Sequence, residues 1–284
     1  MSDQDDALAL VDKFEKKGAT YVETARSSAV VKNISVWPHI NRTALIAGLR
    51  ARIKDPDKIN QENTSLCGPA DFIRDIAEDR PKEYAQAVID LYEKGTATIG
   101  TFTIKSSDSL RSHALAKIPS GVIDASDWVI LASVRDTTNW YFDYAAEDQD
   151  ARAITMPADK VKWFKAGGYT DVVDETNLLI AKDLGSAFRA NSFFKKGYHV
   201  TLFINSDMLS PSTMNNVSTT PDHWVAMTKP MEIRATVPHG FPDEETSVKL
   251  EVYSWGRRIG IPSMGKLTYY HFTANYYGFI ACRR

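Results

Sequence analysis

The chain has 284 residues, enough to bury a core as one large domain or two small ones. Hydrophobic residues make up 43% and charged residues 25%, as in an ordinary globular protein, and the net charge is −2. Lys and Arg are scattered among Asp and Glu, so the sequence predicts no nucleic-acid partner, which would select a basic stripe. No run approaches the roughly 18 apolar residues that a membrane span needs.

The N-terminus, Met1–Asp6, is acidic where a secretory signal would be basic and then apolar. We therefore expect synthesis in the cytoplasm without a signal peptide. Cys67 and Cys282 are the only cysteines, which excludes a disulfide scaffold, although a single bridge between them stays open. The acidic clusters 147–150 and 243–245 lack the spacing of a calcium loop or a zinc site, so no metal or other cofactor is predicted.

Helical patterns fill most of the first two thirds of the chain. They cover 7–26, Thr43–Ile53 with a cap at Asn41 or Thr43, Cys67–Glu78, Pro81–Gly95, Ala125–Val134, Asp159–Lys165, and Thr176–Phe194 with a cap near Asp174 or Thr176. One strand is predicted among them, over Thr96–Lys105, where apolar and polar residues alternate.

Strand patterns dominate the rest of the chain. They cover His199–Ile204, His223–Met227, Met231–Val237, Val248–Tyr253, Leu267–Phe272 and Tyr276–Ile280. Because the predicted helices come first along the chain and the predicted antiparallel strands come second, we expect an α+β fold. Since no repeat or linker interrupts the chain, we expect a single domain over 1–284, with a helical half of about 1–195 and a β-rich half of about 196–284.

The stretch Gln61–Phe72 carries the first chemical signal. Cys67 stands just before a Gly-Pro step and a helical pattern, so it is expected at the positive end of a helix. Unpaired backbone N–H groups and the helix dipole stabilise a thiolate there and lower its pKa. Gln61, six residues upstream, can offer its side-chain amide to an oxyanion that forms at that sulfur.

A thiol nucleophile needs a base, and His223 is the best candidate among six histidines. It begins a predicted strand directly after a turn-like segment, where its side chain can point into a cleft. His199 and His271 lie within apolar or aromatic strand patterns that favour structural roles. Downstream, Tyr253-Ser254-Trp255-Gly256 ends another strand, and a tryptophan there can shield a histidine and its partner from water.

The ordered set of Gln61, Cys67-Gly68, His223 and Ser254-Trp255-Gly256 resembles the papain-like cysteine peptidase superfamily. In that superfamily the order is an oxyanion-hole Gln, a nucleophilic Cys, a general-base His and an orienting Asn or Asp, with Trp-Gly just beyond. The Cys-Gly-Pro-Ala step resembles bacterial papain-like peptidases and toxins more than cathepsins, which carry an aromatic residue after the cysteine. The resemblance covers about 44–95 and 197–282. It implies a papain-like fold, in which the helical half packs against an antiparallel half-barrel.

The residue that orients His223 stays open in the sequence. Alignment on Trp-Gly places Tyr253 where papain-type enzymes carry Asn, and a tyrosine is a poor substitute. Glu251 shares a strand face with Tyr253, whereas Ser254 lies on the other face. For His223 to face Ser254, the connection must be centred near Pro238-His239. The candidates are therefore Glu251, Ser254, Tyr253 and, next to the histidine, Asp222.

The resemblance implies a cysteine hydrolase that cleaves amide bonds through a Cys67 thioester, with a protein or peptide as substrate. A bacterial effector or toxin, exported by a specialised secretion system, is the expected setting, and an immunity or inhibitor protein is a further expected partner. The same machinery also serves a peptidoglycan amidase or endopeptidase and a glutamine deamidase. An alternative of a different class is a catalytically silent papain-like binding module, in which Cys67 and His223 only pack; the missing Asn favours it.

Overall fold

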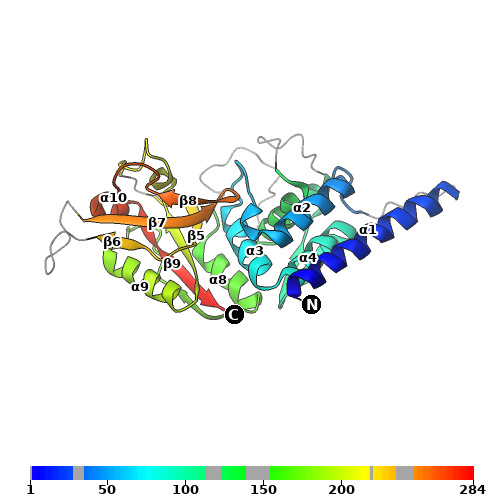
Figure 1. Ribbon diagram of the computed structural model, residues 1–284, viewed down its shortest axis with the longest axis horizontal. Coiled ribbons are helices and arrows are strands. Elements are labelled where there is room, and N and C mark those ends of the chain that lie inside the picture. The colour runs from blue at the N-terminus through cyan, green and yellow to red at the C-terminus, as the bar shows by residue number, and fades with distance from the viewer. Residues whose placement is uncertain (1, 28–34, 113–122, 139–153, 218–219, 235–245) are drawn as a thin grey trace. The chain divides into compact units, whose positions relative to one another are not determined.

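The computed structural model describes residues 2–27, 35–112, 123–138, 154–217, 220–234 and 246–284. Helices predominate in the N-terminal half and a curled antiparallel sheet in the C-terminal half (Figure 1), which confirms the predicted α+β class. The chain forms two compact units, a helical unit (1–153 and 166–168) and a β-rich unit (154–165 and 169–284). No helix among the described residues is long and apolar enough to cross a membrane.

The helical unit confirms the helices that the patterns predict in this part of the chain. They are α1 (Asp3–Ser27), α2 (Arg42–Lys54), α3 (Cys67–Asp79), α4 (Pro81–Lys94) and the run α6 (Ala125–Asp127), η3 (Trp128–Ala132, a π-helix) and α7 (Ser133–Thr138); shorter elements are η1 (Pro56–Lys58) and α5 (Asp108–Ser112). Asn41 is the cap of α2, because its side chain accepts a hydrogen bond from the Ala44 N–H at 2.9 Å.

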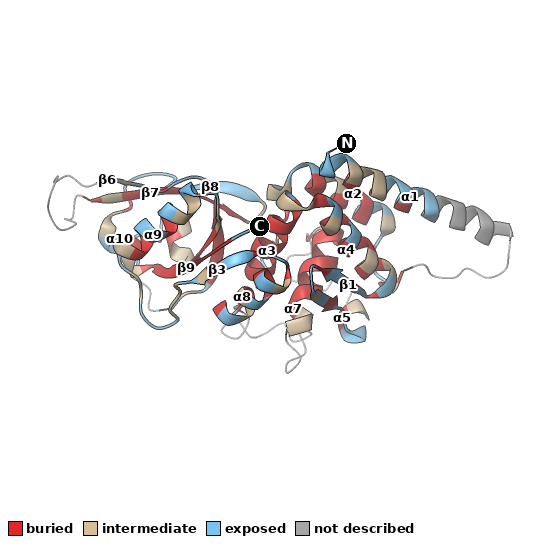
Figure 2. Cartoon of the chain, turned by 90° about the horizontal axis from the view of Figure 1, so that it is seen from below, coloured by how far each residue is buried: buried red, intermediate tan, exposed pale blue. Residues whose placement is uncertain are grey.

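Helix α3 is buried along nearly its whole length, from Cys67 to Ala77 (Figure 2). A helix that is buried on all sides must pair its charges internally. The Arg74 guanidinium meets this need, because it lies 3.0 Å from a carboxylate oxygen of Asp57 and 3.0 Å from one of Asp75. The start of α3, where Cys67 stands, is therefore held in a fixed position within the helical unit.

A hairpin replaces the single strand predicted over Thr96–Lys105. Strands β1 (Thr96–Ile99) and β2 (Phe102–Lys105) pair antiparallel, and Ile99 faces Phe102 across the turn. Gly100 has a φ of 57°, and a Cβ at this position would lie 2.5 Å from the Ala166 carbonyl oxygen. The alternation of apolar residues was correct, but the turn at Gly100 needs this tertiary contact and was missed.

The β-rich unit is built on one antiparallel sheet. Its strands are β3 (Thr170–Asp174), β4 (His199–Ile204), β5 (His223–Met227), β6 (Glu232–Arg234), β7 (Ser247–Ser254), β8 (Arg257–Ile261) and β9 (Tyr276–Arg283). The order is β3-β9-β4-β5-β7-β6, and β8 pairs with β7. The predicted strands His199–Ile204 and His223–Met227 are confirmed residue for residue. The part of Met231–Val237 from residue 235 on lies outside the described residues.

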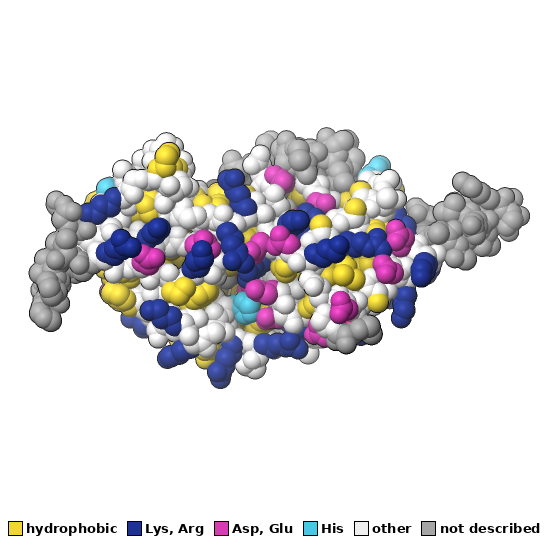
Figure 3. Space-filling view, viewed as in Figure 1, with side chains coloured by type: hydrophobic (Ala, Val, Ile, Leu, Met, Phe, Trp, Pro, Cys, Tyr) yellow, Lys and Arg dark blue, Asp and Glu magenta, His cyan; other side chains and the backbone are white. Residues whose placement is uncertain are grey.

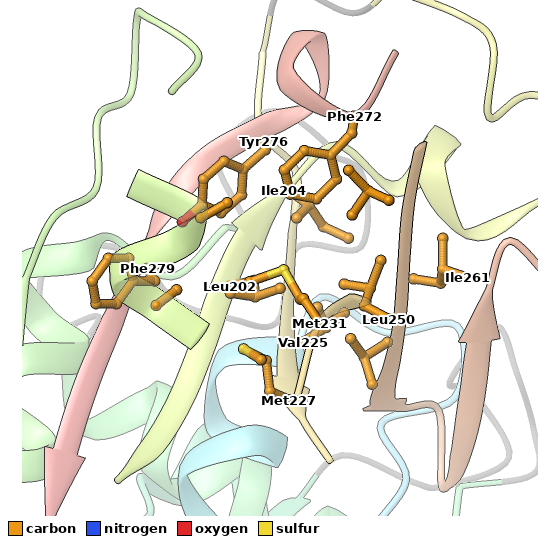
Figure 4. Packing of buried hydrophobic residues seen from close by; sticks show 14 of the residues in the cluster. Leu202, Ile204, Val225, Met227, Met231, Leu250, Ile261, Phe272, Tyr276 and Phe279 are labelled. Atoms are coloured by element: carbon orange, nitrogen blue, oxygen red, sulfur yellow. The ribbon is translucent and has the colours of Figure 1, made fainter. Parts of the chain in front are cut away.

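One face of the sheet carries the main core of this unit. Alternate residues of β4, β5 and β7 point into it, together with apolar residues of α9 (Leu184–Lys195) and α10 (Tyr269–Ala274) (Figure 4). Val225 and Met227 lie on this face of β5, so His223, two residues earlier, belongs to the same face. The core thus sets the direction in which the candidate base points.

The opposite face carries α8 (Pro157–Ala166), which confirms the helix predicted over Asp159–Lys165. Trp224 stacks on Phe203 there with ring centroids 4.2 Å apart, and its indole N–H donates to the Thr155 carbonyl at 2.9 Å. Lys160 of α8 is fully buried, with its ammonium 4.9 Å from the centre of the Trp224 ring. A lysine therefore lies against the residue that follows His223.

Two further predictions of secondary structure were wrong. The helix expected over Thr176–Phe194 begins only at Leu184, where the Asp183 side chain accepts from the Ser186 N–H. The strand expected over Leu267–Phe272 is largely helix α10, capped by Thr268, whose side chain accepts from the His271 N–H. In both cases a side-chain cap overrode an apolar pattern.

The β-rich unit begins at Ile154 rather than near residue 196, because α8 and α9 belong with the sheet and α9 contacts β4 and β9. The single domain over 1–284 stays a prediction. Lys, Arg, Asp and Glu side chains are all scattered over the face seen in Figure 3.

Candidate functional site

The loop that carries Gln61 is fixed in the helical unit by a buried carboxylate. Asp127 accepts two hydrogen bonds of 2.6 Å from Arg52 and one of 2.9 Å from the Asn60 N–H. The Gln61 carbonyl in turn accepts from the Thr64 N–H at 3.2 Å, which closes a turn. Gln61 itself is buried, with 2% of its surface exposed. Its backbone is therefore set by side chains that lie far away in the sequence.

Cys67 is the first residue of α3, as predicted. Leu66 precedes it at the cap position and offers no side-chain acceptor, and the first turn holds no acidic residue. The helix dipole places partial positive charge at this end of α3, which stabilises an anion there. Cys67 is buried, with 6% of its surface exposed; Cys282 on β9 is also buried, with 1% exposed, and both are free thiols.

His223 begins strand β5 in the β-rich unit, as predicted. The Asp222 N–H donates to the Ile204 carbonyl at 3.1 Å, and the Asp222 carboxylate accepts from the N–H and hydroxyl of Ser206 at 2.6 and 2.8 Å. These contacts fix the backbone on which the imidazole stands. His223 is 6% exposed.

Ser254 is the residue that contacts the imidazole. The His223 Nε2 and the Ser254 Oγ lie 2.7 Å apart, and Ser254 is 2% exposed. The contact depends on register: Ala226 faces Tyr253, so His223 and Ser254 lie on the same face, on diagonal positions of β5 and β7. The Pro238-His239 centre expected for this pairing lies outside the described residues.

Trp255 covers the imidazole from the turn between β7 and β8. Its ring stacks on His223 with centroids 4.7 Å apart and an angle of 21° between the planes. Trp255 has a φ of 49° and Gly256 one of 70°, as in the tight turns that join twisted strands. A positive φ is unfavourable for an aromatic residue, and such strain is found mostly at functional sites.

The electrostatics keep the imidazole neutral. Burial, together with the positive charge of Lys160, lowers the pKa of His223 to about 4. A neutral imidazole has one nitrogen that accepts a proton, as a general base requires, but a pKa near 4 makes it a weaker base than an ordinary histidine. The contact at Nε2 holds the ring so that Nδ1 is the nitrogen left for chemistry.

The other candidates for the orienting role do not meet His223. Tyr253 is buried on the opposite face of β7, where its backbone pairs with Ala226. The Glu251 carboxylate binds Thr228 Oγ1 at 3.0 Å and Lys229 Nζ at 2.7 Å. Asp222 binds Ser206, as described above. Within the β-rich unit, the structure therefore brings together Ser254 and His223 and none of the other three.

The remaining histidines have structural surroundings where they are described. His199 packs edge-on against Tyr169, and His271 Nδ1 lies 2.8 Å from the Thr268 hydroxyl, at the start of α10. His39 is exposed. His113, His239 and the acidic clusters 147–150 and 243–245 lie outside the described residues. Among described residues, neither unit by itself gathers three His, Cys, Asp or Glu side chains closely enough to hold a metal ion.

Two residues that influence the candidate residues within their own units were missed in the sequence. Lys160 lies in a helix with charges on most sides, so its full burial has no signature in the local pattern. Asp127 anchors Asn60, 67 residues away, and no local spacing predicts such a pairing. Gln61 and Cys67 belong to the helical unit, whereas His223, Ser254 and Trp255 belong to the β-rich unit.

Comparison with family models, with curated proteins and with solved structures finds no match to this chain.

Proposed function

We propose that the protein is a papain-like cysteine hydrolase that cleaves amide bonds in polypeptides. The observation that carries the proposal is the His223–Ser254 contact of 2.7 Å beneath the stacked Trp255 ring. A histidine that merely fills a core also needs a hydrogen bond at a buried ring nitrogen, but it does not need an aromatic residue at a positive φ stacked over the ring. Cys67 at the start of α3 supports the proposal from the helical unit.

In the proposed reaction the Cys67 sulfur attacks the carbonyl carbon of the substrate amide, and His223 takes the thiol proton. Gln61 and the Cys67 N–H donate hydrogen bonds to the oxyanion. The C–N bond then breaks, His223 returns the proton to the leaving amine, and a thioester remains on Cys67. A water molecule attacks the thioester carbonyl while His223 takes one of its protons. The C–S bond then breaks, His223 returns the proton to the Cys67 sulfur, and the carboxylic acid product leaves.

Ser254 acts as a positioning residue in this proposal. Its hydroxyl oxygen can accept the Nε2–H of the neutral ring, which fixes the tautomer in which Nδ1 accepts the thiol proton. Hydrogen bonds to charged groups are stronger than those to neutral ones, so the contact also strengthens when the ring becomes protonated. A hydroxyl thus takes the place of the amide or carboxylate that orients histidine in papain-type enzymes.

Thiol labelling tests the nucleophile independently of the substrate. Wild type and His223→Gln are treated with iodoacetamide at pH 6, and mass spectrometry follows Cys67 and Cys282 separately. We expect fast modification of Cys67 only, slowed at least about tenfold in the variant, because the thiol loses its base. Cys282 is buried too and serves as the internal reference. Equal, slow labelling of both thiols would instead identify a catalytically silent binding module.

Activity tests the substrate class. Wild type and Cys67→Ala are incubated with a protein extract and with purified peptidoglycan, and new amines and ammonia are measured. We expect Cys67-dependent new amines from protein, and a variant that keeps its melting temperature. Amines from peptidoglycan alone would favour the amidase, and ammonia without chain cleavage would favour the deamidase. Activity that survives in Cys67→Ala would overturn the assignment.

A further inference from the structure

The turn after Ser254 places a cation beside the candidate base. Strand β8 starts immediately after Trp255-Gly256, and its first residue, Arg257, pairs directly with Ser254. Directly paired residues of an antiparallel ladder project on the same face, with Cβ atoms about 5 Å apart. Arg257 therefore projects on the face that carries His223 and Ser254.

Arg258, the next residue, provides the contrast. It pairs with Tyr253 and so projects on the other face of the sheet. An independent observation agrees: the pKa of Glu251, which shares that face, is lowered mainly by its hydrogen bond with Lys229, and the charge of Arg258 adds a smaller contribution. Both arginines are exposed, but they serve opposite sides of the strand.

The Arg257 guanidinium forms no ion pair with the carboxylates of Asp222 or Asp207. Among the described residues, Arg257 makes no ion pair or side-chain hydrogen bond. Asp222 is occupied by Ser206, and the Asp207 carboxylate accepts from the Asn216 amide at 3.1 Å. The turn thus presents a cation whose hydrogen-bond donors are open to an incoming group.

We propose that Arg257 is a specificity-determining residue that binds the carboxylate of an acidic side chain close to the scissile amide of a polypeptide substrate. The inference rests on the proposed function, because it takes Ser254 and His223 to mark the reacting end of the sheet. A guanidinium binds a carboxylate through two parallel N–H···O bonds, which gives both charge and directional selectivity. The preferred substrates therefore carry Asp or Glu next to the cleaved bond.

Exposed charges on an edge strand have a simpler role, since they discourage pairing with other chains. Among the described strands, β8 pairs only with β7, and both arginines suit that role. The simpler role treats the two arginines alike, whereas the proposal concerns Arg257 alone. Arg258 therefore serves as the matched control for Arg257.

The test uses a synthetic peptide library in which each position around the cleaved bond carries Asp, Glu, Asn, Gln, Ala or Lys. The full chain is assayed as wild type, Arg257→Gln, Arg257→Glu and Arg258→Gln, and mass spectrometry gives relative kcat/KM values. Wild type should favour the acidic peptide over its amide analogue by on the order of tenfold or more. Arg257→Gln should bring this ratio near one, Arg257→Glu should favour Lys, and Arg258→Gln should keep the wild-type ratio.

The outcomes separate this inference from the proposed function. Cleavage by wild type without an acidic preference, or a preference that survives in Arg257→Gln, identifies an edge-strand charge only and overturns the inference alone. If wild type cleaves no peptide and Cys67 labels slowly, the proposed function fails and the inference fails with it. Exposed substitutions on β8 should leave the melting temperature nearly unchanged, so a loss of preference cannot be attributed to unfolding.

Discussion

Ser254 Oγ lies 2.7 Å from His223 Nε2, and the Trp255 ring covers the pair. The two residues come from strands β5 and β7, 31 positions apart, and meet because of a local irregularity in the sheet. Met227 pairs with Val252, and Glu232 pairs with Lys249. The four residues between Met227 and Glu232 therefore lie opposite only two residues of β7. This bulged segment shifts the register that decides what meets His223.

Removal of the Ser254 hydroxyl should weaken catalysis more than folding. A hydrogen bond to a charged group contributes about 1.5–3 kcal/mol, so Ser254→Ala should lower kcat/KM by roughly 10- to 100-fold. Ser254→Thr keeps an Oγ on a β-branched side chain that suits a strand, and it should restore most of the activity. The pH profile of kcat/KM should change in Ser254→Ala only. If both variants lose activity equally, the hydroxyl has no positioning role.

His223 should make the folded protein sensitive to acid. Burial and the charge of Lys160 lower its pKa to about 4 in the folded state, whereas an unfolded histidine titrates near 6.5. Between these values the unfolded state binds more protons, so the free energy of unfolding falls as the pH falls through this window, by up to about 3 kcal/mol.

Urea unfolding at several pH values between 7.5 and 4.5 measures this effect. His223→Gln lacks the titrating group, so its stability should decline less than that of wild type between pH 6.5 and 4.5. The difference between the two proteins isolates the histidine from the carboxylates, which titrate in both. A difference that stays constant over this range would mean that His223 titrates normally in the fold.

The sequence predicted the parts of the fold that depend on apolar periodicity and on Gly and Pro at the ends of helices and strands. Cys67 at a helix start followed from Gly68-Pro69, and two strands followed from apolar alternation. The exposed residues 178–180 show the limit: Leu179 and Ile180 are 86% and 67% exposed, yet their apolar character predicted the inside of a helix. No local rule distinguishes an apolar residue held outward by a turn from one that packs.

The candidate site was predictable in its members but not in its contacts. Cys67 and His223 can be proposed from residue type and order, whereas the partner of His223 depends on a register that a bulge shifts. Four orienting candidates were open in the sequence, and only side-chain direction separates Ser254 from Tyr253, its neighbour on the other face. Lys160 belongs to another element, so its effect on His223 could not be predicted.

Gly278 should resist any side chain. It has a φ of 110°, and a Cβ there would lie 2.2 Å from the Glu175 carbonyl oxygen, because the loop after β3 packs directly on β9. Overpacking together with an unfavourable φ should destabilise Gly278→Ala by about 3 kcal/mol or more. Gly260→Ala is the control, since nothing lies within 4 Å of its Cβ position, and it should be neutral or slightly stabilising. Equal urea midpoints for the two variants would contradict this packing.

The Arg52–Asp127 pair should contribute more to folding than any surface pair on the same helix. Asp127 has no exposed surface and accepts both of its 2.6 Å bonds from one guanidinium, so Arg52→Met leaves a buried carboxylate unpaired and should cost about 3–5 kcal/mol in urea unfolding. Arg50→Met removes the two partly exposed ion pairs that Arg50 of α2 forms with Asp12 and Glu15, and it should cost only about 1 kcal/mol. Arg52→Met/Asp127→Asn keeps an acceptor for the Asn60 N–H without the buried charge, so it should be more stable than Arg52→Met alone. If the double variant is instead the less stable, the carboxylate is not the source of the cost.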